Sequence, residues 1–443
     1  MAVSLSLILT ASGLAYYLIQ PTIIGGGTWN PGKESKVYTS HDPLWIEGDA
    51  NFTATAALEG WLGNGTPENP FIIDGLEIAR IWGTIGDEGN CIFINNTRVS
   101  FTITNCNLTG AGCHMMGTVF AGITLQNVSS GLIINNIFQG NEVGILLQDS
   151  HSNTVVNNSY TNNMCGIHLD ESSSNNMTNN TCNDSSYGIS LWESDSNTLA
   201  NNTCNNNYYA GIIFHEPGML SHSGESHLNT VVNNSCNNNE VGISIKGSNS
   251  NTIMNNTCSN NNEAGIYLRN VTNSEVVINT CNKNDIGISL EGSDSNTLTN
   301  NTCKSNDIGI LIEKTMAHYE TELEGVSYQY WKGSDSNTLA NNTCNNNDVG
   351  IAIHESRYNT IVLNSCNYNR IGIFLGSGCR DSNIVVYNTC LGNTENDIAD
   401  EDMFSEPEDL ELPVESMFMG LITFVVITLF VGLMVGKRVS KEE

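Results

Sequence analysis

The chain has 443 residues, with 46 Asp and Glu against 16 Lys and Arg, so its formal net charge is −30. Only 14% of its residues are charged, where about a quarter is usual. Binding to phosphate backbones requires clustered basic residues, so this composition argues against nucleic acid as a partner. A chain of this length normally forms several domains, unless repeats extend one core.

The N-terminal segment 1–32 contains no charged side chain, and residues 5–19 form an apolar stretch. This pattern predicts a secretion signal over residues 1–27, although the basic segment that usually precedes the apolar stretch is absent. An uncleaved signal anchor is the alternative. Residues 28–70 are expected to form a cap module ahead of the repeats. Fifteen Asn-x-Ser/Thr sequons are compatible with an exported glycoprotein.

A repeat with a period of about 22 residues, within the range of solenoid repeats, occupies the middle of the chain. Gly-Ile dipeptides recur at this spacing, and the residue two positions after each Ile is apolar. Such alternation predicts a short strand with one buried face. The dipeptides begin at Gly122, Gly144, Gly166, Gly188, Gly211, Gly242, Gly265, Gly287, Gly309, Gly350 and Gly372.

Each repeat also contains an Asn two residues before a second apolar position, which is Cys in nine repeats. Asn and Gly tolerate the left-handed backbone angles of tight turns, so each repeat is expected to form three short strands separated by turns. Such a unit cannot bury its apolar side chains alone, and successive units should stack about 4.8 Å apart. The predicted fold class is therefore all-β, a parallel β-helix solenoid of about 13 coils over residues 71–395.

Stacking of equal positions predicts a structural ladder inside the rod. Asn side chains in register can hydrogen-bond along the axis and satisfy buried turn groups. The cysteines are interpreted as buried thiols that act as small hydrophobic residues, because Cβ atoms about 4.8 Å apart lie outside the range that favours disulfides. A metal column is the alternative, but interior thiolates would need charge compensation that no nearby residue offers. The predicted ladder consists of Cys182, Cys204, Cys236, Cys258, Cys281, Cys303, Cys344, Cys366, Cys390, Asn202, Asn256, Asn301 and Asn342.

Two segments near the N-terminus carry a family resemblance. Residues 45–52 have the sequence WIEGDANF, and residues 60–73 have the sequence GWLGNGTPENPFII. They resemble the first module of secreted prokaryotic right-handed parallel β-helix proteins, and the repeats up to about residue 395 resemble the NosD-type, pectin-lyase-like family. The resemblance implies a right-handed coil, and a role in carbohydrate binding, sugar hydrolysis or periplasmic copper binding. It implies no catalytic residues, because the repeats of this family are structural.

Two outward positions of the repeat stack carboxylates, one five residues after the Gly and one shortly before the next Gly-Ile. Rows of like charge about 5 Å apart repel each other, so a counterion is favoured. Calcium, which accepts about six to eight oxygen ligands in flexible geometry, is the expected counterion. A solvated acidic face that keeps the rod soluble is the alternative. The candidate metal ligands are Asp149, Glu171, Glu193, Glu216, Glu240, Glu263, Asp285, Asp307 and Asp348.

Two insertions interrupt the repeat at the same turn, directly after the Gly-Ile strand. Insertions in a rigid repeat scaffold commonly build the binding face, although insertions without a function are also tolerated. Residues 215–227 offer His and Met, which ligate copper, and residues 313–332 offer aromatic residues, which suit sugar rings. Copper requires converging donors, and the first insertion contains Pro and Gly, so calcium is favoured over copper. The candidate binding face comprises Trp192, His215, His222, His227, Tyr319, Tyr328, Tyr330 and Trp331.

The C-terminal end combines acidic, apolar and basic segments. Residues 396–415 predict an extended acidic stalk. Residues 416–436 predict a transmembrane helix, because the nineteen uncharged residues 417–435 are enough to cross a bilayer core of about 30 Å. The basic tail, residues 437–443, is then expected in the cytoplasm. A buried core helix is the alternative.

These features predict a protein anchored in the cell membrane, whose extracellular β-helix recognises a carbohydrate or another polymer of the cell envelope. A carbohydrate-active enzyme and a copper-binding factor are the alternatives. Binding is favoured over catalysis, because the six Arg residues of the body form no register that repeats or meets the acidic rows.

Overall fold

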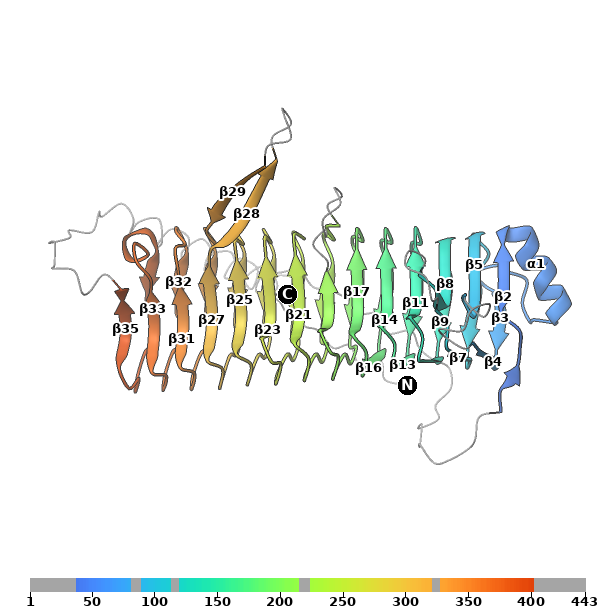
Figure 1. The fold of residues 1–443 in the computed structure, drawn as a ribbon, viewed down its shortest axis with the longest axis horizontal. Helices are drawn as coiled ribbons and strands as arrows, with labels where there is room; N and C mark the ends of the chain where they lie inside the picture. Colours follow the sequence, from blue (N-terminus) through green and yellow to red (C-terminus); the bar gives the residue numbers. More distant parts are fainter. Residues whose placement is uncertain (1–36, 81–88, 113–118, 215–223, 321–326, 402–443) are drawn as a thin grey trace, which may run out of the picture. The chain divides into compact units, whose positions relative to one another are not determined.

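The computed structural model describes residues 37–80, 89–112, 119–214, 224–320 and 327–401 (Figure 1). All of them belong to one compact unit, Val37–Ser405. In this unit the chain winds into successive coils, and neighbouring coils are joined by parallel strand pairing. The prediction of an all-β parallel β-helix is confirmed, and the topology is consistent with the right-handed coil that the resemblance implies.

Three parallel sheets, here named A, B and C, run along the coils. Sheet B has 14 strands: β2 (Leu44–Glu47), β5 (Ile92–Thr97), β8 (Ala121–Val128), β11 (Val143–Gln148), β14 (Cys165–Asp170), β17 (Tyr187–Trp192), β19 (Ala210–Phe214), β21 (Val241–Lys246), β23 (Ala264–Arg269), β25 (Ile286–Glu291), β27 (Ile308–Glu313), β31 (Val349–Ile353), β33 (Ile371–Leu375) and β35 (Asn396–Asp400). Sheet C has 13 strands: β3 (Phe71–Asp74), β6 (Phe101–Thr104), β9 (Gly131–Ile134), β12 (Thr154–Val156), β15 (Asn176–Thr178), β18 (Thr198–Ala200), β20 (Thr230–Val232), β22 (Thr252–Met254), β24 (Glu275–Val277), β26 (Thr297–Thr299), β30 (Thr338–Ala340), β32 (Thr360–Val362) and β34 (Ile384–Val386). Sheet A has six strands: β1 (Thr39–Ser40), β4 (Leu76–Ala79), β7 (Asn107–Thr109), β10 (Ile137–Gln139), β13 (Ser159–Thr161) and β16 (Thr181–Asn183). Beyond β16, single parallel bridges such as that between Thr203 and Ser235 continue sheet A.

The β-helix extends beyond both predicted boundaries. Strand β2 lies in the predicted cap module and pairs with β5, and helix α1 (Gly48–Glu59) buries Phe52 beside it. At the other end β35 pairs with β33, so the assignment of residues 396–400 to the stalk is wrong. The strand was not predicted because its composition is acidic. In the structure Ala399 is buried, and the carboxylate of Asp400 pairs with Arg380 at 3.2 Å.

The segments predicted to reach the membrane are not tested by the structure. The described residues contain no helix that is long and apolar enough to span a bilayer. The predicted secretion signal, residues 1–27, and the predicted transmembrane helix and tail, residues 416–443, lie outside the described residues. Both therefore stay predictions.

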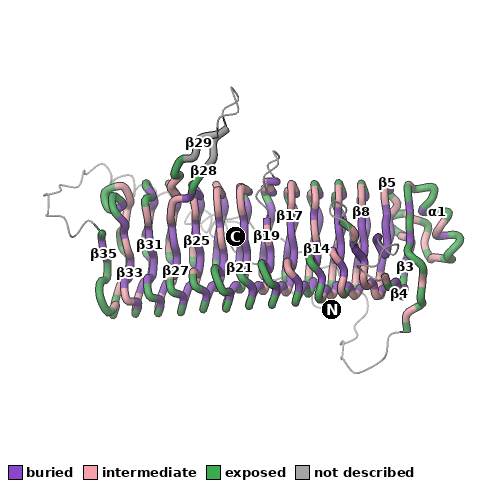
Figure 2. The backbone as a smooth tube through the Cα atoms, in the orientation of Figure 1, coloured by how far each residue is buried: buried purple, intermediate pink, exposed green. Residues whose placement is uncertain are grey.

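The Gly of each Gly-Ile dipeptide marks a close approach between coils. A Cβ atom added to Gly144 would lie 2.5 Å from the carbonyl oxygen of Gly166 and 2.5 Å from the ring of Tyr160. The residues that follow point inward, and Ile145 and Leu147 are completely buried. Figure 2 shows that this burial continues along the inner faces of the coils, while exposed residues gather at the turns. Close packing therefore explains why the repeat requires Gly at this position.

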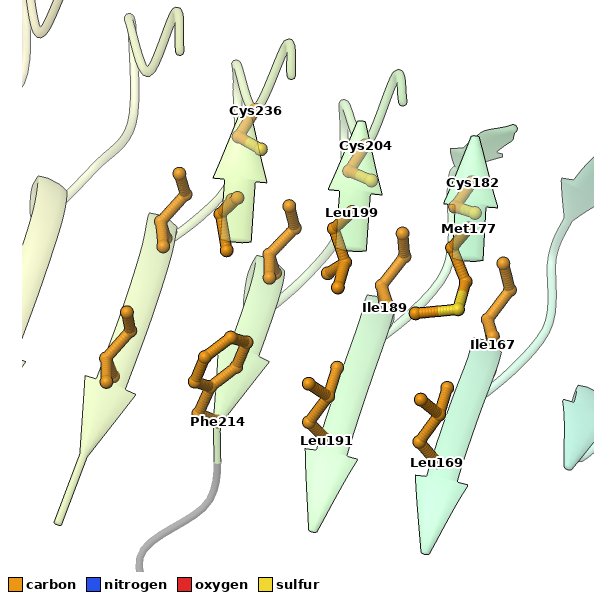
Figure 3. Close-up of a cluster of buried hydrophobic side chains, with 14 of the residues drawn as sticks. Ile167, Leu169, Met177, Cys182, Ile189, Leu191, Leu199, Cys204, Phe214 and Cys236 are labelled. Carbon is orange, nitrogen blue, oxygen red and sulfur yellow. The ribbon is translucent and has the colours of Figure 1, made fainter. Parts of the chain in front are cut away.

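The ladder cysteines superpose along the interior. Figure 3 shows Cys182, Cys204 and Cys236 in successive coils, opposite the Ile and Leu side chains of sheet B. Eight of the nine are completely buried, Cys390 of the last coil is partly exposed, and all are free thiols. Burial raises the pKa of Cys182 and of Cys258, so these thiols stay protonated and pack as small hydrophobic groups.

The buried Asn side chains form hydrogen-bonded rows along the axis. Asn301 Nδ2 donates to the carbonyl oxygen of Val276 at 2.8 Å and to Oδ1 of Asn342 at 3.0 Å. Its own Oδ1 accepts from the backbone N–H of Asn279 at 2.9 Å. Each such Asn satisfies buried turn groups that no strand pairs, and it joins its coil to both neighbours. The same pattern recurs at Asn202, Asn256 and Asn342.

The two insertions leave the body after β19 and after β27 (Figure 1). The second contains an antiparallel hairpin of β28 (Thr315–Glu320) and β29 (Ser327–Lys332). Lys332 Nζ lies 3.1 Å from the Asp294 carboxylate, which fastens the base of the hairpin to the body. Residues 215–223 of the first insertion lie outside the described residues.

Replacing Asn301 by Ala should destabilise the β-helix. The backbone N–H of Asn279 and the carbonyl of Val276 would lose their partners, and each unpaired buried group costs about 1–3 kcal/mol, so the free energy of unfolding should fall by roughly 2–5 kcal/mol. Asn300→Gly is the matched control, because Asn300 is exposed and its φ of 56° suits Gly. Denaturant unfolding followed by circular dichroism measures both variants, and equal stability would contradict the role given to the ladder.

Candidate functional site on the outer face of sheet B

A polar cluster lies on sheet B between the two insertions. Strands β21, β23, β25 and β27 end in Lys246, Arg269, Glu291 and Glu313, which are register partners in successive coils. The residues before them, Ile245, Leu268, Leu290 and Ile312, are completely buried. Because side chains alternate along a strand, the four charged residues point outward. The scaffold thus places two cations and two carboxylates in one row.

Tyr267 connects the charged groups of the cluster. Its hydroxyl donates a hydrogen bond of 2.6 Å to Oε2 of Glu291, and Arg269 Nε lies 4.0 Å from the same oxygen. Lys246 Nζ lies 5.8 Å from the centre of the Tyr267 ring. Burial, and then the hydrogen bond to Glu291 and its charge, raise the pKa of Tyr267 well above its usual value. The hydroxyl therefore stays protonated at neutral pH and acts as a donor.

Two buried polar atoms of this cluster have no hydrogen-bond partner. Among the described residues, three buried side-chain polar atoms lack a hydrogen bond, and two of them are Arg269 Nε and Ser289 Oγ. Ser289 is the register partner of Tyr267 on the next strand, so the two atoms lie on neighbouring strands of one face. Unsatisfied buried groups are rare in folded proteins and require an explanation. Both atoms have almost no exposed surface, so they are not open to a ligand in this structure.

Two tryptophans flank the cluster. Trp192 ends strand β17, and a Cβ added to Gly224 of the first insertion would lie 3.0 Å from its ring. Trp331 on the hairpin is 60% exposed, and Lys314 Nζ lies 4.4 Å from its ring centre. Tyr330 beside it is 49% exposed. Of the predicted binding face, Trp192 lies two strands before the cluster in sheet B, and Tyr330 and Trp331 lie on the hairpin that follows it. The sequence analysis did not find the cluster itself.

Of the remaining residues of the predicted binding face, only the side chain of His227 is described. His215 and His222 lie outside the described residues. Tyr319 and Tyr328 are partners across the hairpin. Both ring nitrogens of His227 have partners in the β-helix. Nε2 lies 3.1 Å from the Glu225 carboxylate, and Nδ1 accepts a hydrogen bond of 2.9 Å from the backbone N–H of Asn249.

A second aromatic group was missed by the sequence analysis. The rings of Tyr187 and Tyr209 stack with centres 5.2 Å apart, and Tyr208 packs edge-on against Tyr209 at 4.6 Å. Tyr208 is 72% exposed. The consecutive Tyr208 and Tyr209, where most other repeats have Asn and an acidic residue, were the available signal.

The first acidic row lies at the end of the sheet B strands. Asp149, Glu171 and Glu193 all adopt a left-handed backbone, with φ of 47°, 48° and 45°, while Glu216 lies outside the described residues. The charge of Asp149 is the main cause that raises the pKa of Glu171. The expected repulsion between stacked carboxylates is therefore present in this row.

The second acidic row contains a contact between a carboxylate and an arginine, which was not expected from the sequence. Glu240, Glu263, Asp285 and Asp307 are exposed, and the pKa of Glu263 is raised by burial and then by the charge of Glu240. Asp348, however, accepts hydrogen bonds of 2.8 and 3.0 Å from Arg370, which lower its pKa. The expectation that no Arg meets the acidic rows is wrong, because Arg370 occupies the position of the row one coil after Asp348.

The comparisons with known proteins identify the family. Residues 64–221, 218–320 and 322–403 match the family described as periplasmic copper-binding protein (NosD), which covers more than half of the chain. The chain belongs to this family. No curated protein matches the sequence.

Solved structures share the fold at low sequence identity. A double mutant of the periplasmic alginate epimerase AlgG has a TM-score of 0.52 and 15% identity, over 77% of this chain and 83% of that chain. The A-module of the Azotobacter vinelandii mannuronan C-5 epimerase AlgE4 has a TM-score of 0.41 and 15% identity, over 84% and 96%. PfbA, a surface adhesin of Streptococcus pneumoniae, has a TM-score of 0.45 and 11% identity, over 69% and 83%. At these identities the likeness shows the fold alone.

The described residues do not assemble the metal site that the family name implies. Across the described ranges, no group of three or more His, Cys, Asp or Glu side chains is arranged to hold a metal ion. Of the three histidines of the first insertion, only His227 is described, and both of its ring nitrogens have partners. Calcium on the acidic rows stays a prediction.

Asp149→Asn should stabilise the protein more at pH 7 than at pH 3. The pKa of Glu171 is raised in the folded state, so repulsion in the row is absent below the unfolded pKa of about 4.3 and grows as pH rises through the folded pKa. Asn also suits the left-handed backbone, but that gain does not depend on pH. Thermal melts at the two pH values separate the effects, and an equal gain at both would contradict the repulsion.

Proposed function

We propose that the outer face of sheet B between the insertions binds an acidic carbohydrate, with Lys246 and Arg269 on its carboxylate or sulfate groups. The observation that carries the proposal is the cluster itself: two neighbouring cations on the outer face of sheet B, in a chain of net charge −30. A planar guanidinium binds carboxylate and sulfate oxygens through two parallel hydrogen bonds. The exposed ring of Trp331 suits the apolar face of a sugar, whereas Tyr330, the preceding residue of β29, points to the other face of the hairpin.

The chemistry of the cluster favours binding over catalysis. Removal of a proton beside a uronate carboxyl requires a base that is free near neutral pH. Tyr267 is held protonated by burial and by Glu291, and Glu291 already accepts its hydroxyl proton in a hydrogen bond. Glu313 has a pKa raised by burial and by the charge of Glu291, and it is the cluster's remaining acid–base candidate.

Arg269→Ala and Lys246→Ala should each weaken binding to an oligouronate by about tenfold or more, because each removes a charge-assisted contact of roughly 1.5–3 kcal/mol. Lys304→Ala is the control, since it removes the same charge outside sheet B. Titration of the full chain with the oligouronate measures affinity, and the same samples are checked for shortened, epimerised or unsaturated products. Equal affinity of all variants would refute the site, and product formation would favour an enzyme.

We also propose that residues 416–436 anchor the chain in a membrane, with the β-helix outside the cell. The proposal is supported by the nineteen uncharged residues and the basic tail that follows them.

Deletion of residues 416–443 should release the body from cells into the medium. The helix supplies the apolar length that crosses the bilayer, and no other segment after residue 36 contains such a length. Immunoblots of medium and washed membranes measure the distribution. If the shortened chain stays on membranes, the N-terminal segment is an uncleaved anchor and the single C-terminal anchor is wrong.

A further inference from the structure

The turns of the last coils carry aromatic residues. Leu228 and Ile278 are also exposed at turns with positive φ, but among the described residues the aromatic ones with such a φ are all in the last coils. In the preceding coil, Ser336, Asn341 and Asn346 occupy the three turns with φ between 56° and 60°. One coil later, in the register that pairs β30 with β32, the same positions are Tyr358, Leu363 and Tyr368. In the final coil the position of Leu363 becomes Tyr387. The residues Tyr358, Leu363, Tyr368 and Tyr387 are here called the C-terminal collar.

The collar surrounds the coil because its members occupy different corners. Tyr358 lies between β31 and β32, so it marks the corner from sheet B to sheet C. Leu363 and Tyr387 directly follow the sheet C strands β32 and β34. Tyr368 lies between the bridge residue Ser365 and β33, which is the corner from sheet A to sheet B. Aromatic rings therefore project from all three corners of the rod near its C-terminal end.

Most of the surface of each collar tyrosine is exposed, although the ring of Tyr368 lies against Gly392 of the next coil. Tyr358, Tyr368 and Tyr387 are 70%, 67% and 71% exposed. All have φ between 56° and 60°, a backbone that is unfavourable for side chains other than Gly and Asn. Bulky residues that are both strained and exposed suggest selection for a partner rather than for folding.

We propose that the C-terminal collar rests in the uncharged headgroup layer of the membrane that holds residues 416–436. The proposal rests on the membrane anchor proposed above. The last strand ends at Asp400, and the fifteen residues 401–415 reach at most about 50 Å, so the anchor keeps this end of the rod near the bilayer. Tyr is enriched at the interface between membrane and water because its ring is apolar and its hydroxyl is polar.

The charged residues near the collar favour lipids with a particular headgroup charge. Arg357 and Arg380 are exposed at this end, but Asp381, Glu395 and Asp397 are exposed there too. The surrounding carboxylates disfavour an anionic surface, so zwitterionic headgroups are the better match. A second copy of the chain is the competing occupant.

Tyrosine labelling of the full chain in phosphatidylcholine vesicles tests the proposal. Hydroxyl radicals modify exposed rings, and mass spectrometry reads each position. Tyr208, which is 72% exposed and lies in a coil far from the collar, is the internal control. Tyr358, Tyr368 and Tyr387 should be modified at least about threefold less than Tyr208, because interfacial burial excludes water from their rings.

A variant with all three collar tyrosines replaced by Asn provides the second measurement. Asn suits the left-handed backbone, so the variant should fold. Protease added outside should cut residues 402–415 and release the body from vesicles at least about threefold faster than in the unchanged chain, because the collar no longer holds that end at the surface.

The outcomes separate the anchor from the collar. A chain that does not float with vesicles overturns the anchor, and the collar proposal with it. Flotation with equal labelling of all four tyrosines and equal release rates overturns the collar alone. Collar protection that persists without lipid, together with a dimer in sedimentation, would assign the surface to a second copy and overturn the membrane contact.

Discussion

The structure depends on one constraint, which is that each coil must satisfy the backbone groups of the next. Strand pairing does this along the three sheets, but the turns leave buried N–H and C=O groups that no strand pairs. The Asn rows fill this gap, since each side chain accepts from one coil and donates to another, as Asn301 does between Asn279 and Asn342. Polar side chains can therefore be buried throughout the rod, beside the continuous apolar core that its Ile, Leu and Cys side chains form.

The same constraint explains where function can arise. Stacking in register places identical side chains above one another in successive coils. This is favourable for Asn and Cys inside the rod and unfavourable for carboxylates on its surface. The raised pKa of Glu171 beside Asp149 records this cost. Between the insertions the outward row instead changes sign, from Lys246 and Arg269 to Glu291 and Glu313. This change of charge along a regular sheet is the feature on which the proposed binding face rests.

The sequence predicted the coil but not the candidate site. The regular period of the Gly-Ile dipeptides determined which Gly, Ile, Cys and Asn stack, because stacking in register follows directly from a constant spacing. The polar cluster could not be found in this way, since Lys246, Arg269 and Glu291 differ in chemistry and share only their place in the register. The contact of Arg370 with Asp348 was missed for the same reason. Arg370 differs in chemistry from the acidic residues of its row, and only the stacking of the coils places it beside Asp348. Strand β35 was missed because its acidic residues conceal the apolar ones.

The central claim is that a cation pair on sheet B recognises an acidic sugar. A crystal structure of the full-length chain's complex with an oligouronate tests it most directly. The account predicts a carboxylate within about 3 Å of both Lys246 Nζ and the Arg269 guanidinium. An oligouronate bound instead at the tyrosines near Tyr209, or along the acidic rows through a metal ion, would contradict it.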